Sequence, residues 1–317
     1  MSVLSQDMPQ AGISAVSAWR SVMASVVVFG VVPNAALAAD EPGLHTLPSA
    51  FEAAATPQQL RWRNAGIITG ASALVGAYGY SKWWNEGFNK GFHAVNEDWF
   101  GRDTQYGGQD KLGHTYFSYV GMRLLTRAFE LGGNEPGNAI RLGAWSTLGI
   151  MTAVEMLDGY SRQHQFSKED AIMNVIGALG GYVLESNPDL DRLFDFRLLY
   201  KPSPEVKQAG RYNIASDYTG QTYLLVAKAN GVPALREHPV LRYLELAVGY
   251  GTNGYESTQG VPRTRRAYFG VSLNVTEVLR QTVFSGARQR SAVQRTSEMF
   301  FELIQVPGTA ALANHQF

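Results

Sequence analysis

The sequence predicts a mainly α-helical protein: a Gly/Ala-rich four-helix bundle with a small C-terminal antiparallel β element. Four long runs either lack charged residues or place apolar residues at helical spacing, and small residues fill their interiors. Closer to the C-terminal end, two stretches alternate between apolar and polar residues, as half-buried strands do. Hydrophobic residues make up 45% of the 317 and charged residues 17%, so the chain has enough apolar side chains for a sizeable core.

The first helical run, Asn64–Ser81, contains no charged residue. Its length makes it a candidate for a membrane-spanning helix. Its glycines and alanines would let a second helix approach closely, as in membrane proteins. An aromatic and basic group typical of membrane interfaces follows it directly: Lys82, Trp83 and Trp84. The sequence leaves open whether this helix spans a membrane or lies buried in an ordinary bundle.

Three further helical runs follow, at Leu112–Leu131, Ala139–Leu157 and Glu169–Glu185. Their apolar residues recur every three to four positions. Glycine and proline stand at their expected ends, at Gly132, Gly133, Pro136 and Pro188. The uncharged part of each is too short to cross a bilayer alone. Together with the first run they make up the predicted bundle.

The C-terminal region contains two alternating stretches, Tyr243–Tyr250 and Ala267–Val275, which predict a β-hairpin. Two strands alone are only marginally stable. We therefore expect a third strand from Gln221–Ala227 or Met299–Val306, or packing of the hairpin on the bundle.

The N-terminal segment predicts an exported protein. Residues 1–38 resemble a signal peptide, with an uncharged stretch that ends in Ala36-Leu37-Ala38, and an uncleaved anchor is the alternative. Residues 39–62 form a polar lead-in, residues 63–200 the helical bundle domain, and residues 201–317 a C-terminal α+β region with the hairpin. The expected location is the periplasm, in association with the inner or the outer membrane.

Composition excludes several classes of function. Lys+Arg and Asp+Glu number 27 each, so no excess of positive charge favours nucleic acid. The sequence has no cysteine, which excludes disulfides, thiolate metal sites and cysteine nucleophiles. It also lacks a phosphate-binding glycine loop with lysine, a nucleophile elbow, a zinc-protease histidine pair and a dinucleotide fingerprint.

Polar residues inside apolar helices are costly unless they have partners, so they mark the candidate site. Asp110, Lys111 and His114 stand at the start of the second helical run, where Asp110 alone would be read as a helix cap and His114 as a core histidine. Two further groups stand at the ends of the third and fourth runs. All three point to one shared pocket with these members: Asp110, Lys111, His114, Glu155, Asp158, Arg162, His164, Asp170 and Asn174.

A resemblance to a known family rests on the same residues. Asp110-Lys111-x-x-His114, then Glu155, then Ser167-x-x-Asp170-x-x-x-Asn174 resembles the YfiM-like family, which comprises predicted periplasmic lipoproteins of unknown function. The resemblance covers roughly residues 80–200 and includes the stretch 96–101. The lack of cysteine departs from a lipoprotein of the usual acylated kind. The pattern is more distantly similar to VanZ-like membrane proteins, and neither family implies a settled reaction.

Three functions follow as hypotheses. The first is a non-enzymatic, membrane-associated envelope protein whose C-terminal region contacts an envelope partner. The second is a site for a lipid phosphate or cell-wall lipid intermediate, in which Lys111 and Arg162 hold the phosphate while His114 or His164 acts as acid or base. The third is a metal site drawn from His114, Glu155, Asp158, His164 and Asp170. Because no familiar ligand spacing appears, the sequence assigns no metal and no cofactor. The expected partners are a membrane or lipid, and not nucleic acid.

Overall fold

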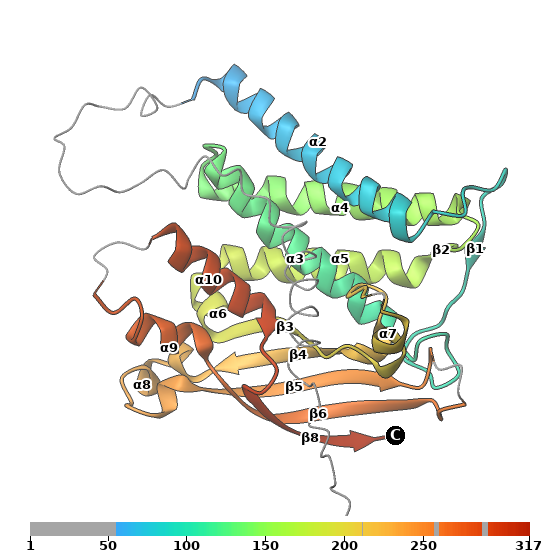
Figure 1. Cartoon of the computed structure of the whole chain (residues 1–317). Helices are drawn as coiled ribbons and strands as arrows, with labels where there is room; N and C mark the ends of the chain where they lie inside the picture. Colours follow the sequence, from blue (N-terminus) through green and yellow to red (C-terminus); the bar gives the residue numbers. More distant parts are fainter. Residues whose placement is uncertain (1–54, 211, 257–259, 287–290) are drawn as a thin grey trace, which may run out of the picture.

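A computed structural model describes residues 55–317, apart from residues 211, 257–259 and 287–290 (Figure 1). The predicted signal peptide, residues 1–38, and most of the polar lead-in lie outside the described residues.

The four predicted helices are confirmed, as α2 (Pro57–Lys82), α3 (Gln109–Leu131), α4 (Pro136–Tyr160) and α5 (Lys168–Ser186). α3 packs against both α4 and α5, and α2 lies across α4 and α3 on the outside (Figure 1). α2 is not a buried helix, since Gly79 is its one buried residue and its Trp62 and Tyr80 are exposed. Among the helices of the described residues, none has the length and apolar character needed to cross a membrane.

Small residues bring α3 and α5 close together. A methyl group on Gly177 of α5 would lie 2.0 Å from the carbonyl oxygen of Thr115 on α3. One turn later, a methyl group on Gly181 would lie 2.9 Å from Met122 Sδ. Only glycine permits this contact, which holds the first turns of α3 and α5 side by side.

The prediction of a mainly α four-helix bundle with a small β element is wrong, because the chain forms a substantial mixed sheet. Its strand order is β7-β3-β4-β5-β6-β8, and only the β3–β7 pair is parallel. The strands are β3 (Phe194–Tyr200), β4 (Gln221–Lys228), β5 (Leu244–Asn253), β6 (Thr264–Leu273), β7 (Ile304–Gln305) and β8 (Ala310–Gln316). The hairpin β5–β6 and the strand at β4 are as predicted. The strand β3 was missed, although Phe194, Phe196 and Leu198 alternate with Asp195 and Arg197.

Short helices close the ends of the sheet. The helices α6, α8, α9 and α10 gather at one end of the sheet, and α7 lies at the other end (Figure 1). Their bounds are α6 (Pro188–Leu193), α7 (Pro204–Ala209), α8 (Pro233–Arg236), α9 (Val275–Gln281) and α10 (Ala292–Leu303). A parallel pair, β1 (Ala94–Val95) and β2 (Phe166–Ser167), joins the loop before α3 to the start of α5.

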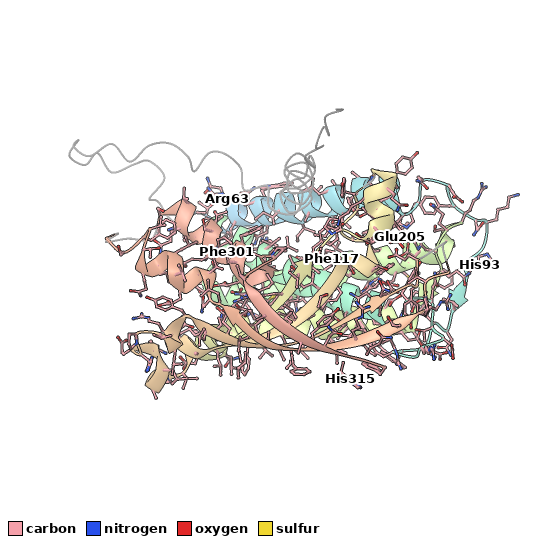
Figure 2. All side chains as sticks on the ribbon, turned by 60° about the horizontal axis from the view of Figure 1, so that its bottom comes forward. Arg63, His93, Phe117, Glu205, Phe301 and His315 are labelled. Atoms are coloured by element: carbon pink, nitrogen blue, oxygen red, sulfur yellow. The ribbon has the colours of Figure 1, made fainter. Side chains whose placement is uncertain are left out.

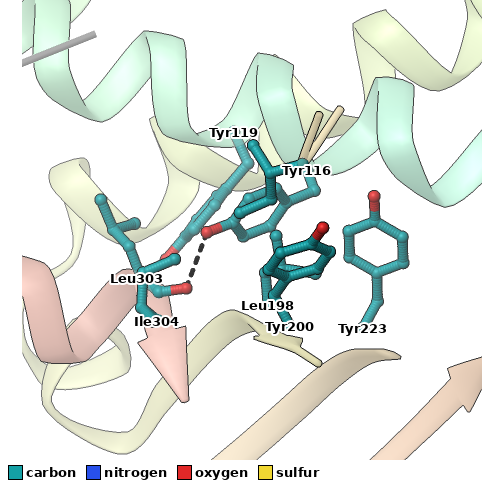
Figure 3. Close-up of a cluster of buried hydrophobic side chains, with 8 residues drawn as sticks. Tyr116, Tyr119, Leu198, Tyr200, Tyr223, Leu303 and Ile304 are labelled. Atoms are coloured by element: carbon teal, nitrogen blue, oxygen red, sulfur yellow. Dashed lines mark hydrogen bonds between the residues drawn. The ribbon is translucent and has the colours of Figure 1, made fainter. Parts of the chain in front are cut away.

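An aromatic core joins α3 to the sheet (Figure 3). Tyr116 and Tyr119 of α3 pack against Leu198, Tyr200 and Tyr223 of β3 and β4. The Tyr116 hydroxyl donates a hydrogen bond to the Leu303 carbonyl, 2.7 Å away, where α10 ends and β7 begins. The helices and the sheet therefore share one core.

On β5, a charged side chain faces the interior and apolar side chains face outward, the reverse of an ordinary half-exposed strand. Glu245 of β5 and Ser272 of β6 lie opposite each other and are buried. Leu246 and Val248 of β5, on the other face, are 66% and 54% exposed. Alternation therefore predicted the strands correctly, but the apolar side that would normally be buried faces outward.

Candidate functional site

The candidate site lies where the first turns of α3 and α5 meet the last turns of α4. α3 contributes Asp110, Lys111 and His114, while α4 contributes Glu155. α5 contributes Asp170 and Asn174. The sequence prediction placed these six side chains in one pocket, and the structure brings them together.

Lys111 is the buried cation of the site, at 3% exposure. Its ammonium nitrogen lies 2.7 Å from Asp170 Oδ1 and 3.3 Å from Asp110 Oδ2, and it also pairs with Glu97. Burial alone would lower the pKa of Lys111, but Asp110 and Asp170 outweigh burial and raise it. Lys111 therefore stays charged and joins α3 to α5.

His114 has a carboxylate near each ring nitrogen. Its Nδ1 lies 3.1 Å from Glu155 Oε1, and its Nε2 lies 3.8 Å from Asp170 Oδ2 and 3.9 Å from Asp110 Oδ1. Burial lowers the pKa of His114, but the surrounding carboxylates, led by Asp170, hold it well above its usual range. In the absence of another cation, His114 is therefore protonated.

A hydrogen-bonded chain fixes Glu155 behind His114. The Asn174 amide donates to Glu155 Oε1 at 3.0 Å, and the Ser118 hydroxyl donates to Asn174 Oδ1 at 2.8 Å. All three side chains are buried. Because a held carboxylate on one ring nitrogen sets the tautomer of a histidine, Glu155 directs the Nε2 lone pair of a neutral His114 towards Asp110 and Asp170.

The pKa values of the two aspartates at the site shift in opposite directions. Burial raises the pKa of Asp170 to about 8, even though His114 and Lys111 lie close by. Burial also acts to raise the pKa of Asp110, but His114 and Lys111 outweigh it and hold that pKa below its usual range. The Tyr218 hydroxyl donates to Asp110 Oδ1 at 2.9 Å, which further favours the ionised form.

Local structure explains how the loop before α3 reaches the site. Gly108 has a φ of 86°, and a methyl group on it would lie 2.2 Å from the ring of Phe100. Pairing of β1 with β2 carries the chain past the start of α5, where the Ser167 hydroxyl accepts from the Asp170 N–H at 3.3 Å. These constraints place Glu97 against Lys111.

Three predicted members lie outside the contacts of the site. Asp158 accepts a hydrogen bond from Trp84 Nε1 at 2.6 Å, and burial raises its pKa to about 7. Arg162 and His164 are exposed because α4 ends at Tyr160 and the chain turns outward. Lys111, and not Arg162, thus neutralises the buried carboxylates.

Sequence reasoning did not assign Glu97, Ser118 or Tyr218 to the site. Glu97 stands in the stretch 96–101 that contributed to the family resemblance, so its pattern was visible although its place was not. Ser118 follows His114 by one helical turn, which was the available signal for it. Tyr218 belongs to a short 3₁₀ turn, Tyr218–Gly220, far along the chain, and no local pattern marks it.

Three of these side chains have the geometry of metal ligands. Asp110, His114 and Asp170 each offer one ligand atom, and the three atoms lie within 4.8 Å of one another. Ligands about 2.1 Å from a tetrahedral Zn²⁺ lie about 3.4 Å apart, so the separations of His114 Nε2 from Asp110 and Asp170, 3.9 and 3.8 Å, would have to shorten by about half an ångström. Asp110 and Lys111 also border a cavity of about 10 Å³, roughly the space of one water.

Residues 96–186 match the family model of predicted periplasmic lipoproteins (DUF2279). The match supports a periplasmic protein of unknown function, which is the coarser part of the resemblance in the sequence. It supports neither the YfiM-like nor the VanZ-like assignment specifically. It includes every site residue on α3, α4 and α5 but not Tyr218. No curated protein and no solved structure matches the chain.

Proposed function

We propose that this protein binds a divalent cation of the Zn²⁺ class through Asp110 Oδ1, His114 Nε2 and Asp170 Oδ2. The observation that carries the proposal is a shortage of positive charge. Among the described residues, the only cationic partners of four carboxylates, those of Glu97, Asp110, Glu155 and Asp170, are Lys111 and His114. Even with both cations charged, the group has two more negative than positive charges.

Burial, with the charge of Asp110 beside it, favours a proton on Asp170. A carboxyl group with a pKa of about 8 is mostly protonated at neutral pH, although a lysine lies 2.7 Å away. A divalent cation between Asp110, His114 and Asp170 would replace the protons on His114 and Asp170, so that all four carboxylates are ionised and the group keeps one net negative charge. Carboxylate oxygen and imidazole nitrogen are ligands that Zn²⁺ accepts.

The surroundings of His114 also favour a metal ligand. Metal-binding histidines usually donate their second ring N–H to a carboxylate or carbonyl group. Glu155 occupies that position at 3.1 Å from Nδ1 and is itself held by Asn174. Tyr218 supports Asp110 in the same way.

The same charges argue against direct binding of a lipid phosphate at these side chains. A phosphate would meet an excess of carboxylates, and Arg162, which was expected to hold it, is exposed beyond the end of α4. The proposal is therefore one of binding, in agreement with a non-enzymatic role, and it assigns no reaction.

Isothermal titration of the metal-free protein with Zn²⁺ tests this. We expect stoichiometric binding with proton release, measured by repeating the titration in buffers of different ionisation enthalpy. His114→Gln and Asp170→Asn should each weaken binding by at least about 100-fold. Asp158→Asn, a nearby carboxylate outside the triad, is the matched control and should bind as the wild type. Absence of Zn²⁺ binding, or equal loss in the control, would overturn the proposal.

A further inference from the structure

A continuous apolar strip covers the outward face of the central strands. Opposed pairs in the register build it: Leu244 faces Leu273, Leu246 faces Val271, and Val248 faces both Leu225 and Phe269. All seven side chains are exposed, from 38% for Leu244 to 66% for Leu246. None of the seven is charged. We call this set the apolar strip.

The strip cannot be buried by turning the sheet over, because the opposite face already has its own partners. Between the strip residues, the strands β4 and β5 point Val226, Lys228, Glu245 and Ala247 inward, and all four are buried. β7 and β8 follow each other in the chain with only residues 306–309 between them, yet β7 lies at one edge of the sheet and β8 at the other. The sheet therefore curls around this buried face, and the curvature of its strands is visible in Figure 2. The strip lies on the other face.

Aromatic side chains stand at both ends of the strip. At one end, the Arg242 guanidinium lies 5.8 Å from the ring of Tyr243. At the other end, Tyr250 packs near Phe317, and the Arg265 guanidinium lies 4.6 Å from the Phe317 ring. Apolar surface between aromatic and basic ends is the arrangement found where a protein meets the lipid headgroup and acyl regions.

The helix α5 also has apolar side chains on its exposed face and polar side chains on its buried face. Its Ile172, Ile176 and Leu179 are exposed, while Asp170 and Asn174 face inward. A two-fold dimer through the sheet would cover the strip but leave α5 exposed, because each such interface uses one patch. Contact with the hydrocarbon region of a bilayer is not restricted to one such patch.

We infer that the apolar strip docks this protein on a lipid bilayer. The inference does not depend on the cation site, since it uses none of the site residues. Burial of several exposed leucine, valine and phenylalanine side chains is enough to drive such binding.

The absence of cysteine permits a direct test with the exported protein. A single Val248→Cys substitution, labelled with an environment-sensitive fluorophore, should give a blue-shifted and brighter emission on addition of phosphatidylethanolamine:phosphatidylglycerol (3:1) vesicles. Leu131→Cys at the end of α3, 60% exposed and away from the strip, is the control and should not change. An unchanged spectrum at position 248 overturns the inference, whatever else binds the vesicles.

A substitution that introduces a charge into the apolar strip provides a second test. Because Leu246 is exposed, Leu246→Glu should keep the fold, checked by circular dichroism, and lower co-flotation with the same vesicles by at least about 10-fold. Leu131→Glu should float as the wild type. A second copy would instead give a dimer in light scattering that Leu246→Glu dissociates, without flotation of the wild type, and that result would also overturn docking on lipid.

Discussion

Two of the buried ionic groups in the described part of the chain, one inside the sheet and one at the helix ends, differ in charge balance. Inside the sheet, Asp195 and Glu245 face Arg197 and Lys228, two carboxylates against two cations. Arg197 makes two hydrogen bonds of 2.8 Å to Glu245. The carboxylates are fully buried, and burial, which raises the pKa of Asp195, is outweighed by Lys228 and Arg197.

The group at the helix ends has four carboxylates against Lys111 and His114, and it is partly open. The side chain of His114 is 21% exposed, whereas that of Arg197 is 3% exposed. A balanced and closed group has no vacancy for a ligand, so its role is to hold strands together. An unbalanced group with an opening is the one that can take up a cation. The comparison teaches that net charge, more than burial, separates the two roles.

The largest expected effect concerns the balanced group. Arg197→Met removes the cation that Asp195 and Glu245 share, and it should lower the free energy of unfolding by about 3–5 kcal/mol, because it leaves buried carboxylates unpaired. Urea unfolding followed by circular dichroism measures it. Arg192→Met, in a surface pair with Asp189, is the control and should change stability by less than about 0.5 kcal/mol. Equal effects would remove the distinction between the buried and the surface ion pair.

The next effect concerns the contact that assembles the unbalanced group. Gly177→Ala would force α5 away from the Thr115 carbonyl and should cost about 2 kcal/mol, together with weaker Zn²⁺ binding. Gly180→Ala, on the same helix but with nothing within 4 Å, should stabilise the protein by about 0.5–1 kcal/mol. Thermal unfolding of the pair measures both. The same sign for the two variants would show that α3 and α5 are not in tight contact.

The last effect, the smallest when counted per pH unit, is a pH dependence that the unbalanced group should show and the balanced group should not. Asp170 binds its proton more tightly in the folded protein, with a pKa raised from 3.8 to about 8. The folded state therefore loses stability as pH rises through that window, by about 1 kcal/mol per pH unit for the metal-free protein. His114, whose pKa is also raised, acts in the same direction above its usual value. Asp195 has a lowered pKa, so it stays ionised throughout this range and contributes no slope.

Urea unfolding at pH 5, 6, 7 and 8 measures this slope. Asp170→Asn, which cannot ionise, should flatten it, and saturating Zn²⁺ should do the same to the wild type. A steep slope that persists in Asp170→Asn would place its origin elsewhere, for instance at Asp158, whose pKa is about 7.

The sequence allowed most of the helical site to be predicted, because periodicity places residues that share a helix face. His114, Glu155, Asp170 and Asn174 were found in this way. Arg162 and His164 were misplaced because periodicity does not tell where α4 ends and the chain turns away. Glu97 and Tyr218 reach the site through loop geometry and long-range packing, neither of which has a local pattern.

The sheet shows a different limit. Alternation at Leu244, Leu246 and Val248 correctly predicted a strand and its two faces. It did not tell which face is buried, because that depends on whether polar side chains from other strands can pair with one another. Asp195 and Arg197 do so with Glu245, and they share the buried face with Leu224, Val226 and Ala247. The strand β3 was missed, and with it the size of the sheet.

The segment 304–316 has a consequence for the order of folding. It supplies both β7 and β8, so β3 and β6 each keep an unpaired edge until this segment has been synthesised, after every other strand. Closure of the sheet therefore joins residues far apart in the chain, a slow step because the ends of a long loop must first meet. The sheet therefore cannot close until its C-terminal segment is available, however early the helices form.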